Sequence, residues 1–448
     1  MKTGSMQITQ VGAPTPRAVA VPVPDPRSVA AVMFAVFGGY EVSARVVAAA
    51  RRAPLGRVLA ELEHARVLGL VDQSHPGYYW CTPLAEQLPA PKAALVGAAR
   101  SRAGVFLLAC SRHVAEVMPG SLLPPVRIAA LPAPDPTIVD AHAGYDWAQI
   151  HRPAVMKLAA DTARAGRDER KFGMLAVDLA LAGIAGAMAA GNTVAWEALA
   201  NIAFDASLTV DDNIGQGYGL EHLGKSRKAQ GRFEKARATQ CAALRHREAI
   251  HDARGIVCST NAVGLAHWAI GDLTGAEAIF EQAVKLADES ADRDFAALAR
   301  QNLAGVLTAG QGATGETFAT ALQLLDRAAA RHTEAGLLQA LANCHSLRAA
   351  ALRRRASADG DFTAAVLAGL AAVQAVDRSA EIGLAGHDYA ELARALSAAG
   401  NDQQARAWAE TAIALFHCAG STDREQMLRE EFAHLGLESD VMESGVDR

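Results

Sequence analysis

The chain has 448 residues, of which 51% are hydrophobic but only 5% aromatic, so a large core would consist mainly of alanine, leucine and valine. Such a composition favours helices over sheets. The net charge of −5 argues against a general attraction to nucleic acids or anionic membranes. The six cysteines are scattered and form no C-x-x-C pair. They predict reduced thiols in a cytoplasmic protein, with neither a disulfide framework nor a zinc site.

The first 27 residues contain several prolines and predict a flexible arm. They include no apolar run followed by a cleavage site, so they do not resemble a secretion signal. No continuous apolar run in the chain approaches the roughly 18 residues that a membrane span requires. We therefore expect no membrane partner.

Residues 28–90 predict a small unit of three helices followed by a β-hairpin. The third helix begins near Pro54 and carries Leu55, Val58 and Leu62 on one side. Two short runs rich in β-forming residues follow and are joined by a Pro-Gly turn. This order of elements is typical of a winged-helix domain.

A winged helix that reads DNA needs an excess of positive charge facing the phosphates. Arg51, Arg52 and Arg57 are the candidates for such contacts, but Glu61 and Glu63 nearly balance the charge of the third helix. The pattern favours a structural or protein-docking role over direct DNA binding. DNA stays an alternative partner.

A helical connector is predicted over residues 91–150, and a regular array follows it. Glycines recur after apolar helical runs: Gly191, Gly231 and Gly271 are 40 residues apart, as are Gly360 and Gly400. Each glycine lies between two amphipathic helical patterns, which predicts a helical hairpin. A single hairpin cannot bury its own apolar stripe, but a stack can. About six hairpins should therefore form an α-solenoid over residues 151–435, followed by a flexible tail at 436–448.

The small residues of these hairpins resemble the tetratricopeptide repeat. Gly264 lies seven residues before Gly271, and Ala276, Phe280 and Ala283 follow the turn. The period near 40 is longer than the 34 residues of the plain repeat. The resemblance implies that the first helix of each hairpin lines a concave groove.

A match to the phosphate-binding loop of nucleotide hydrolases occurs at residues 219–226, GLEHLGKS. A true phosphate-binding loop follows a buried strand and leaves its glycines free to surround phosphate. Here Gly224 has the same repeat position as Gly264, and no βαβ pattern surrounds it. We predict glycines that serve helix packing, a solvated or groove-facing Lys225, and no cofactor.

Catalytic motifs are scarce in this sequence. His246 and His251 are five residues apart, so they do not stack on one helix face. The chain has neither an H-E-x-x-H motif nor a G-x-S-x-G elbow. The sequence predicts no metal site and favours a protein without catalytic activity, although a site assembled from distant helices would leave no local motif.

The order of winged helix and repeat array also resembles the C-terminal half of actinobacterial regulators of the signal-transducing ATPase class, in which an NB-ARC ATPase comes first. Residues 144–169 resemble the junction of that family, and the likeness extends over roughly residues 30–435. Two departures stand out: no ATPase precedes the winged helix, and Cys81 takes the place of the histidine that senses phosphate. The resemblance implies the back half of such a regulator, acting alone.

Three asparagines form the best candidate site. Asn261, Asn302 and Asn343 follow one another at steps of 41 residues on predicted first helices. An amide both donates and accepts hydrogen bonds, so a ladder of amides would hold an extended peptide backbone. The alternative is that these amides only solvate the groove. The same register adds further groove residues, which are Tyr218, Glu221, Lys225, Lys228, Trp268, His387 and Arg394.

The sequence leaves three functions open. The first is a cytoplasmic regulatory module that binds a peptide or a partner protein in the groove. The second is a DNA-binding transcription regulator of a biosynthetic pathway, gated by that groove. The third is an accessory or catalytic protein of natural-product biosynthesis that holds a substrate in the solenoid. A groove lined with amides favours the first function, a basic winged-helix surface the second, and a deep pocket with converging titratable groups the third.

Overall fold

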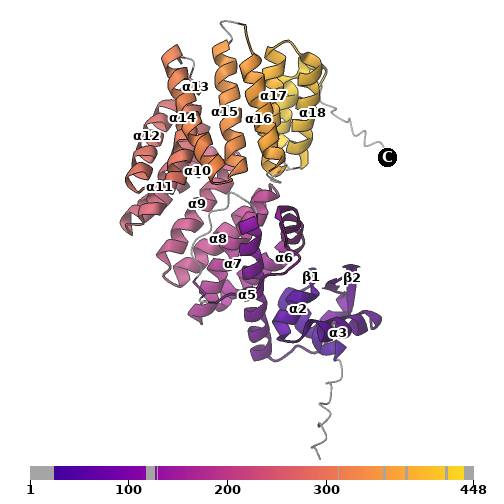
Figure 1. Cartoon of the computed structure of the whole chain (residues 1–448). Helices are drawn as coiled ribbons and strands as arrows, with labels where there is room; N and C mark the ends of the chain where they lie inside the picture. Colours follow the sequence, from indigo (N-terminus) through magenta and orange to yellow (C-terminus); the bar gives the residue numbers. More distant parts are fainter. Residues whose placement is uncertain are drawn as a thin grey trace, which may run out of the picture.

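The computed structural model describes residues 25–117, 127–128, 130–310, 312–356, 360–378, 382–418 and 422–437. Within these residues the chain forms nineteen α-helices, one 3-10 helix and three short strands (Figure 1). The molecule is an α-solenoid of tetratricopeptide-like hairpins with a small mixed unit at its N-terminal end, as the repeat pattern predicts. Most of the predicted arm and tail lies outside the described residues.

The N-terminal unit places helices around a small antiparallel sheet with the strand order β1-β3-β2. Its elements are α1 (Pro26–Phe37), β1 (Val42–Ser43), α2 (Ala44–Arg51), α3 (Leu55–Val67), β2 (Val71–His75), β3 (Tyr78–Cys81) and α4 (Pro83–Glu86). β1 was not predicted, because two residues are too short to show a period. The predicted arm, residues 1–27, overlaps the start of α1 at Pro26. Asp25 caps this helix by accepting a hydrogen bond from the Ser28 amide at 3.0 Å.

Two long helices, α5 (Ala93–Val117) and α6 (Ala141–Ala165), join this unit to the array. The predicted boundary between connector and solenoid, at 150/151, is wrong, because α6 runs through it. Pro153 lies inside α6 and does not end it. Buried residues of α1, α3, α5, α6, α7 and α8 form one continuous apolar cluster. The N-terminal unit therefore shares its core with the start of the solenoid.

Six helical hairpins follow, and in each of them the first helix carries an odd number. They are α7 (Arg170–Ala189) with α8 (Thr193–Thr209), α9 (Asn213–Ala229) with α10 (Phe233–Ala249), α11 (Ala253–Ala269) with α12 (Leu273–Glu289), α13 (Arg293–Ala309) with α14 (Gly315–Glu334), α15 (Leu338–Ala356) with α16 (Thr363–Asp377), and α17 (Ile382–Ala398) with α18 (Asp402–Cys418). A final helix, α19 (Thr422–Glu431), and η1 (Ala433–Leu435) pack against α18 and α17. The tail begins later than predicted, since Leu437 is buried in that cluster.

The turns explain the glycine spacing. The five repeat glycines have φ angles between 63° and 83°, in the left-handed region where glycine carries no steric penalty. Halfway between them, Asp211, His251 and Ala291 have φ angles of 54° to 56°. From α8 to α13 every helix has 17 residues. The repeat of 40 is thus two helices of equal length, each followed by a three-residue turn.

The array returns toward its own start. Each first helix contacts the next one along the chain, and α17, the last of them, contacts α7, the first. In Figure 1 the lower ends of the orange and yellow C-terminal helices accordingly reach the magenta helices. The first helices therefore surround a concave interior instead of lining an open trough.

Two helices, α5 and α7, are long and apolar enough by length and composition to cross a membrane, which the search for continuous apolar runs did not indicate. Most of α7 is buried inside the protein. A core helix of a soluble protein has the same properties, so this evidence for a membrane span is weak.

Candidate functional site in the concave groove

The concave interior contains a cavity of about 160 Å³. Its lining side chains come from α7, α9, α11 and α13, which are the first helices of four successive hairpins. The α7 side is apolar, with Leu181, Ile184 and Met188. The α9 and α11 side is polar, and it includes the predicted groove residues Tyr218, Glu221, Lys225 and Asn261.

Glu221 and Arg247 form a buried ion pair at the polar wall. Arg247 is fully buried, and its Nη1 lies 2.7 Å from Glu221 Oε2. The same nitrogen donates to the Gly255 carbonyl at 2.9 Å and to Ser259 Oγ at 3.0 Å. The guanidinium also lies over the Tyr218 ring, 4.9 Å from its centroid. The pair joins α9, α10 and α11 at one point.

The sequence analysis missed Arg247, although two glycines make room for it. A Cβ at Gly217 would lie 2.9 Å from Arg247 Nε, and a Cβ at Gly255 would lie 2.6 Å from its Cδ. Glycines on two successive first helices, with an arginine on the helix between them, are the signal that could have located it.

The pKa values of the titratable groups in this polar wall do not suit acid–base catalysis near neutral pH. Burial alone would raise the pKa of Glu221, but Lys225 and Arg247 outweigh it and hold that pKa below its usual range. Burial and the charge of Lys225 lower the pKa of His222 to about 3. Burial raises the pKa of the Cys258 thiol to about 12. At neutral pH the wall thus holds a carboxylate, a neutral imidazole and an unreactive thiol.

Two of the three predicted asparagines meet. Asn302 Nδ2 donates to Asn261 Oδ1 at 2.9 Å, across the contact between α11 and α13, and both residues are 6% exposed. Asn343 on α15 is half-buried and has no hydrogen-bond partner among the described residues. The predicted ladder of three amides is therefore a buried pair plus a separate amide. Repeat spacing in the sequence did not reveal that the amides would bond to each other.

The expected groove residue Trp268 is half-buried and packs between hairpins. Its ring packs edge-on to Phe280 at 6.5 Å, within an apolar cluster between hairpins. A Cβ at Gly305 would lie 2.4 Å from the indole, so the missing side chain of that glycine accommodates the ring. A large apolar ring gains more from this contact than from facing a polar groove.

The predicted far end of the groove is also partly occupied. Arg394 is held by Glu431 of α19, with Nη2 and Oε2 2.8 Å apart, and by Glu391 at 3.3 Å. Solvent reaches His387, whose ring packs on Phe416 at 5.2 Å. The pKa of His387 is lowered, because desolvation of its ring and the charges of Arg424, Arg394 and Lys228 disfavour the imidazolium. Arg394 therefore fixes α19 and is not free for a ligand.

The phosphate-loop match lies inside α9, as predicted, and its glycines touch neighbouring helices. A Cβ at Gly219 would lie 2.9 Å from the Phe204 backbone, and a Cβ at Gly224 would lie 2.3 Å from Gln240 Nε2. Lys225 forms an ion pair with Glu221 of the same helix. These glycines allow close helix packing, and none of them forms a loop around an anion.

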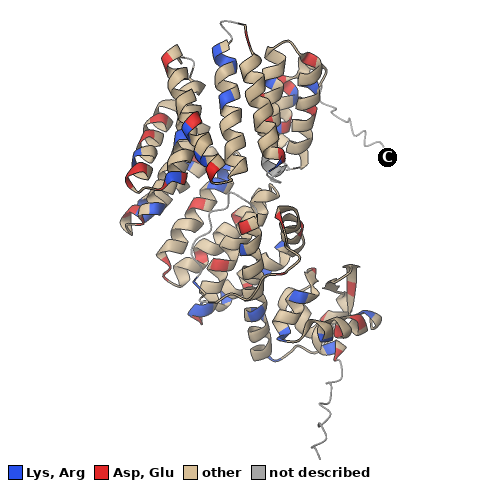
Figure 2. Cartoon of the chain, in the orientation of Figure 1, with Lys and Arg blue, Asp and Glu red and all other residues tan. Residues whose placement is uncertain are grey.

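The arginines proposed for DNA are mostly paired. Arg51 and Arg57 both bind the carboxylate of Glu61, which is fully buried, and Arg57 Nε lies 2.9 Å from Glu61 Oε1. Arg52 is exposed. Figure 2 shows both signs of charge on α3 rather than a basic face. Cys81 is buried, and burial raises its pKa to about 12.

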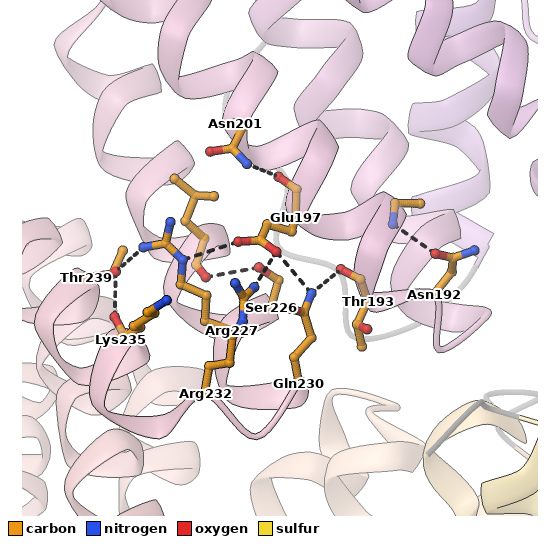
Figure 3. A network of polar contacts seen from close by, with 12 residues as sticks. Asn192, Thr193, Glu197, Asn201, Ser226, Arg227, Gln230, Arg232, Lys235 and Thr239 are labelled. Carbon is orange, nitrogen blue, oxygen red and sulfur yellow. Dashed lines mark hydrogen bonds and ion pairs between the residues drawn. The ribbon is translucent and has the colours of Figure 1, made fainter. Parts of the chain in front are cut away.

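A second polar network, on α8, α9 and α10, was also missed (Figure 3). Glu197 accepts hydrogen bonds from Arg227 at 3.3 Å, from Gln230 at 3.2 Å and from Arg232. Gln230 also donates to the Thr193 carbonyl at 2.9 Å. The network fixes the start of α8 to the turn between α9 and α10.

No group of three His, Cys, Asp or Glu residues in the described part of the chain is placed to hold a metal ion.

The chain has weak similarity to several solved structures. No protein-family model and no curated protein matches the chain. Among solved structures, BtubC from P. vanneervenii is 17% identical over 51% of this chain and 92% of its own, with a TM-score of 0.39. A Rap protein complexed with competence and sporulation factor is 12% identical over 91% of this chain and 99% of its own, at 0.41. A signal-transduction ATPase with a tetratricopeptide repeat sensor, from Pyrococcus horikoshii, is 12% identical over 92% and 64%, at 0.36.

Proposed function

We propose that this protein is an interaction module that captures an extended peptide segment of a partner protein in its concave groove. The observation that carries this proposal is the cavity lined by four successive first helices, with an apolar wall from α7 facing a polar wall from α9 and α11. An apolar wall that faces a polar wall suits a peptide, because a peptide presents apolar side chains and backbone polar groups together.

The asparagine pair supports backbone recognition. The mutual bond uses one N–H of Asn302 and one acceptor site of Asn261. Both N–H donors of Asn261 and the carbonyl of Asn302 stay available to a peptide bond. Asn261 lines the cavity directly. This pair would bind a backbone with little regard to the side chains of the peptide.

A catalytic role has less support, although titratable groups converge on the same cavity. Glu221 is held as a carboxylate by two cations, which makes it a weak base, and the thiol of Cys258 stays protonated at neutral pH. His222 is uncharged, and its Nδ1 accepts a hydrogen bond from Trp196 Nε1 at 3.3 Å. These states favour binding over bond breaking.

We also propose that the N-terminal unit is a winged-helix-like domain that docks to a protein, and that the chain acts in a regulatory, cytoplasmic setting like that of the ATPase-class regulators it resembles. Two observations support docking over DNA reading. Arg51 and Arg57 are neutralised by Glu61, and α2 and α5 pack together, with Arg102 Nε donating to the Ala50 carbonyl at 2.8 Å.

The test is titration calorimetry with a partner identified by pull-down and mass spectrometry. Replacing both amides in Asn261→Ala/Asn302→Ala leaves neither amide without its mate, so the fold should survive. Each lost bond to the peptide costs about 1–3 kcal/mol, so affinity should fall at least roughly tenfold.

The matched control is Asn401→Ala, an exposed residue at the turn between α17 and α18. Its partner affinity should equal that of the native protein. Asn343→Ala measures whether the separate third amide contributes. An affinity unchanged in the Asn261/Asn302 double variant would contradict the proposal.

A further inference from the structure

A second and larger cavity, of about 720 Å³, lies where the array returns to its start. We call it the closure cavity. One side is formed by the start of α8 and the turn between α9 and α10, and the other by the end of α18 and by α19. The lining residues that matter here are Val194, Lys228, Phe233, Cys418, Arg424 and Met427.

The closure cavity is positively charged. Lys228 of α9 and Arg424 of α19 line it from its two sides. Within the described residues neither cation has a hydrogen bond or ion pair, and no described acidic side chain lines the cavity. The neighbouring Arg227 and Arg232 both bind Glu197 (Figure 3). Lys228 has no such partner in the part of the chain that the structure describes.

The local electrostatics agree with this geometry. Burial, together with the charges of Lys225 and Arg424, lowers the pKa of Lys228 to about 8. Desolvation, followed by the charges of Arg424, Arg394 and Lys228, also lowers the pKa of His387. The turns that line the cavity bring a helix end and a helix start together, so their dipoles largely offset each other. The uncompensated charge is therefore that of the side chains.

Apolar groups surround these cations. Val194, Phe233 and Met427 are 74%, 40% and 68% exposed, although all three are large apolar side chains. Exposed apolar side chains gathered at one concave place indicate a contact surface. A ligand that fits must offer carboxylates to the cations and apolar groups to these three residues.

We propose that the closure cavity binds an acidic peptide segment in which carboxylate and apolar side chains alternate. Its carboxylates pair with Lys228 and Arg424, and its apolar side chains cover Val194, Phe233 and Met427. This binding rests on the proposed function in one respect only, that the ligand is a peptide. The site itself is separate from the Asn261–Asn302 pair and adds a charge preference that the amides cannot supply.

The experiment uses the full chain and the thiol of Cys418, which is exposed and lines the cavity. The probe is a short capped peptide of alternating glutamate and leucine. It should slow alkylation of Cys418, followed by mass spectrometry, without slowing alkylation of Cys241 on α10. In Lys228→Gln/Arg424→Gln the affinity should fall at least roughly tenfold, because each charged hydrogen bond contributes about 1.5–3 kcal/mol.

Two control variants separate the possible failures. Lys235→Gln removes an exposed lysine outside the cavity and should bind the probe normally. Asn261→Ala/Asn302→Ala should also bind it normally, so loss of the groove function would leave this site intact. Thermal unfolding of Lys228→Gln/Arg424→Gln should show no loss of stability relative to the native protein, because two unpaired cations that repel each other add none.

Three results would overturn the proposal. Equal protection of Cys418 by citrate would mean a site for small anions. Equal protection by a peptide of alternating lysine and leucine would mean apolar contact without charge recognition. Unchanged affinity in a correctly folded Lys228→Gln/Arg424→Gln variant would mean that the two cations do not contact the ligand.

Discussion

The two ends of this molecule are stabilised in different ways. From α1 to α8 the buried residues form one continuous apolar cluster that joins the N-terminal unit to the first hairpin. From α9 onward the apolar contacts divide into several small clusters. Polar contacts connect the hairpins there, such as Arg247 with Ser259 and Asn261 with Asn302.

The difference shows how a repeat protein can fix its register. Alanine and glycine stripes are interchangeable between hairpins, so apolar packing alone would allow neighbours to slide. A buried ion pair or amide pair has one correct partner, and an unsatisfied buried polar group is costly. We infer that one shared apolar core dominates the first half, although buried Glu61 is paired there too, and that polar contacts between hairpins matter more in the second half.

Arg247→Leu should cause the largest loss of stability in the part of the array that begins at α9. It leaves the buried carboxylate of Glu221 with Lys225 alone, and loss of one member of a buried pair costs about 3–5 kcal/mol. Urea unfolding measures this loss. The double variant Arg247→Leu/Glu221→Gln should recover part of it, and a single variant as stable as the native protein would contradict the pairing model.

His151 tests the contact between the N-terminal unit and α6. Its Nε2 accepts a hydrogen bond from the Ser43 amide at 3.2 Å, and its Nδ1 donates to the Trp147 carbonyl at 2.9 Å, so the ring must be neutral. Burial lowers its pKa from 6.5 to about 4. The unfolded chain takes up this proton first as pH falls, so the stabilisation is complete above pH 6.5 and is lost between pH 6.5 and 4.

The expected loss from this group is about 3 kcal/mol over that window, at 1.36 kcal/mol per pKa unit. The check compares chemical unfolding of the native protein and His151→Gln between pH 7 and 4. The variant should lose less stability on acidification, because glutamine keeps an acceptor but does not titrate. Identical acid profiles would show that His151 does not couple the N-terminal unit to α6.

Gly264→Leu should have the smallest of the three effects. A Cβ at Gly264 would lie 2.7 Å from the Phe280 ring, and overpacking of this kind costs about 1–3 kcal/mol. The matched control is Gly315→Ala at the start of α14, where a Cβ meets nothing within 4 Å. Thermal unfolding should rank the two variants clearly, and equal melting temperatures would mean that the repeat glycines are not packing positions.

The hairpins could be predicted because turn chemistry is local. A glycine with positive φ after an apolar helical run marks a turn wherever it occurs, and the equal spacing of Gly191, Gly231 and Gly271 gave the helix lengths. The boundary inside α6 could not be read in this way, since a helix that continues through Pro153 carries no stop signal.

The site was only partly predictable, for a related reason. Repeat register placed Tyr218, Glu221 and Asn261 on the groove wall, because first helices face inward. Register says nothing about partners from second helices or from α19, and therefore missed Arg247 and misjudged Arg394. The packing of Trp268 was equally unpredictable, because it depends on the space left by Gly305 of another hairpin.

The contact of α17 with α7 has a consequence for how this chain can change over evolutionary time. In a linear array each hairpin touches only its neighbours, so duplication or deletion of a unit is tolerated. Here a gained or lost unit of 40 residues would displace α17 and α19 from α7 and α9 and would open the closure cavity. The number of hairpins is thus fixed by geometry, and new specificities must arise by substitution on the existing helices.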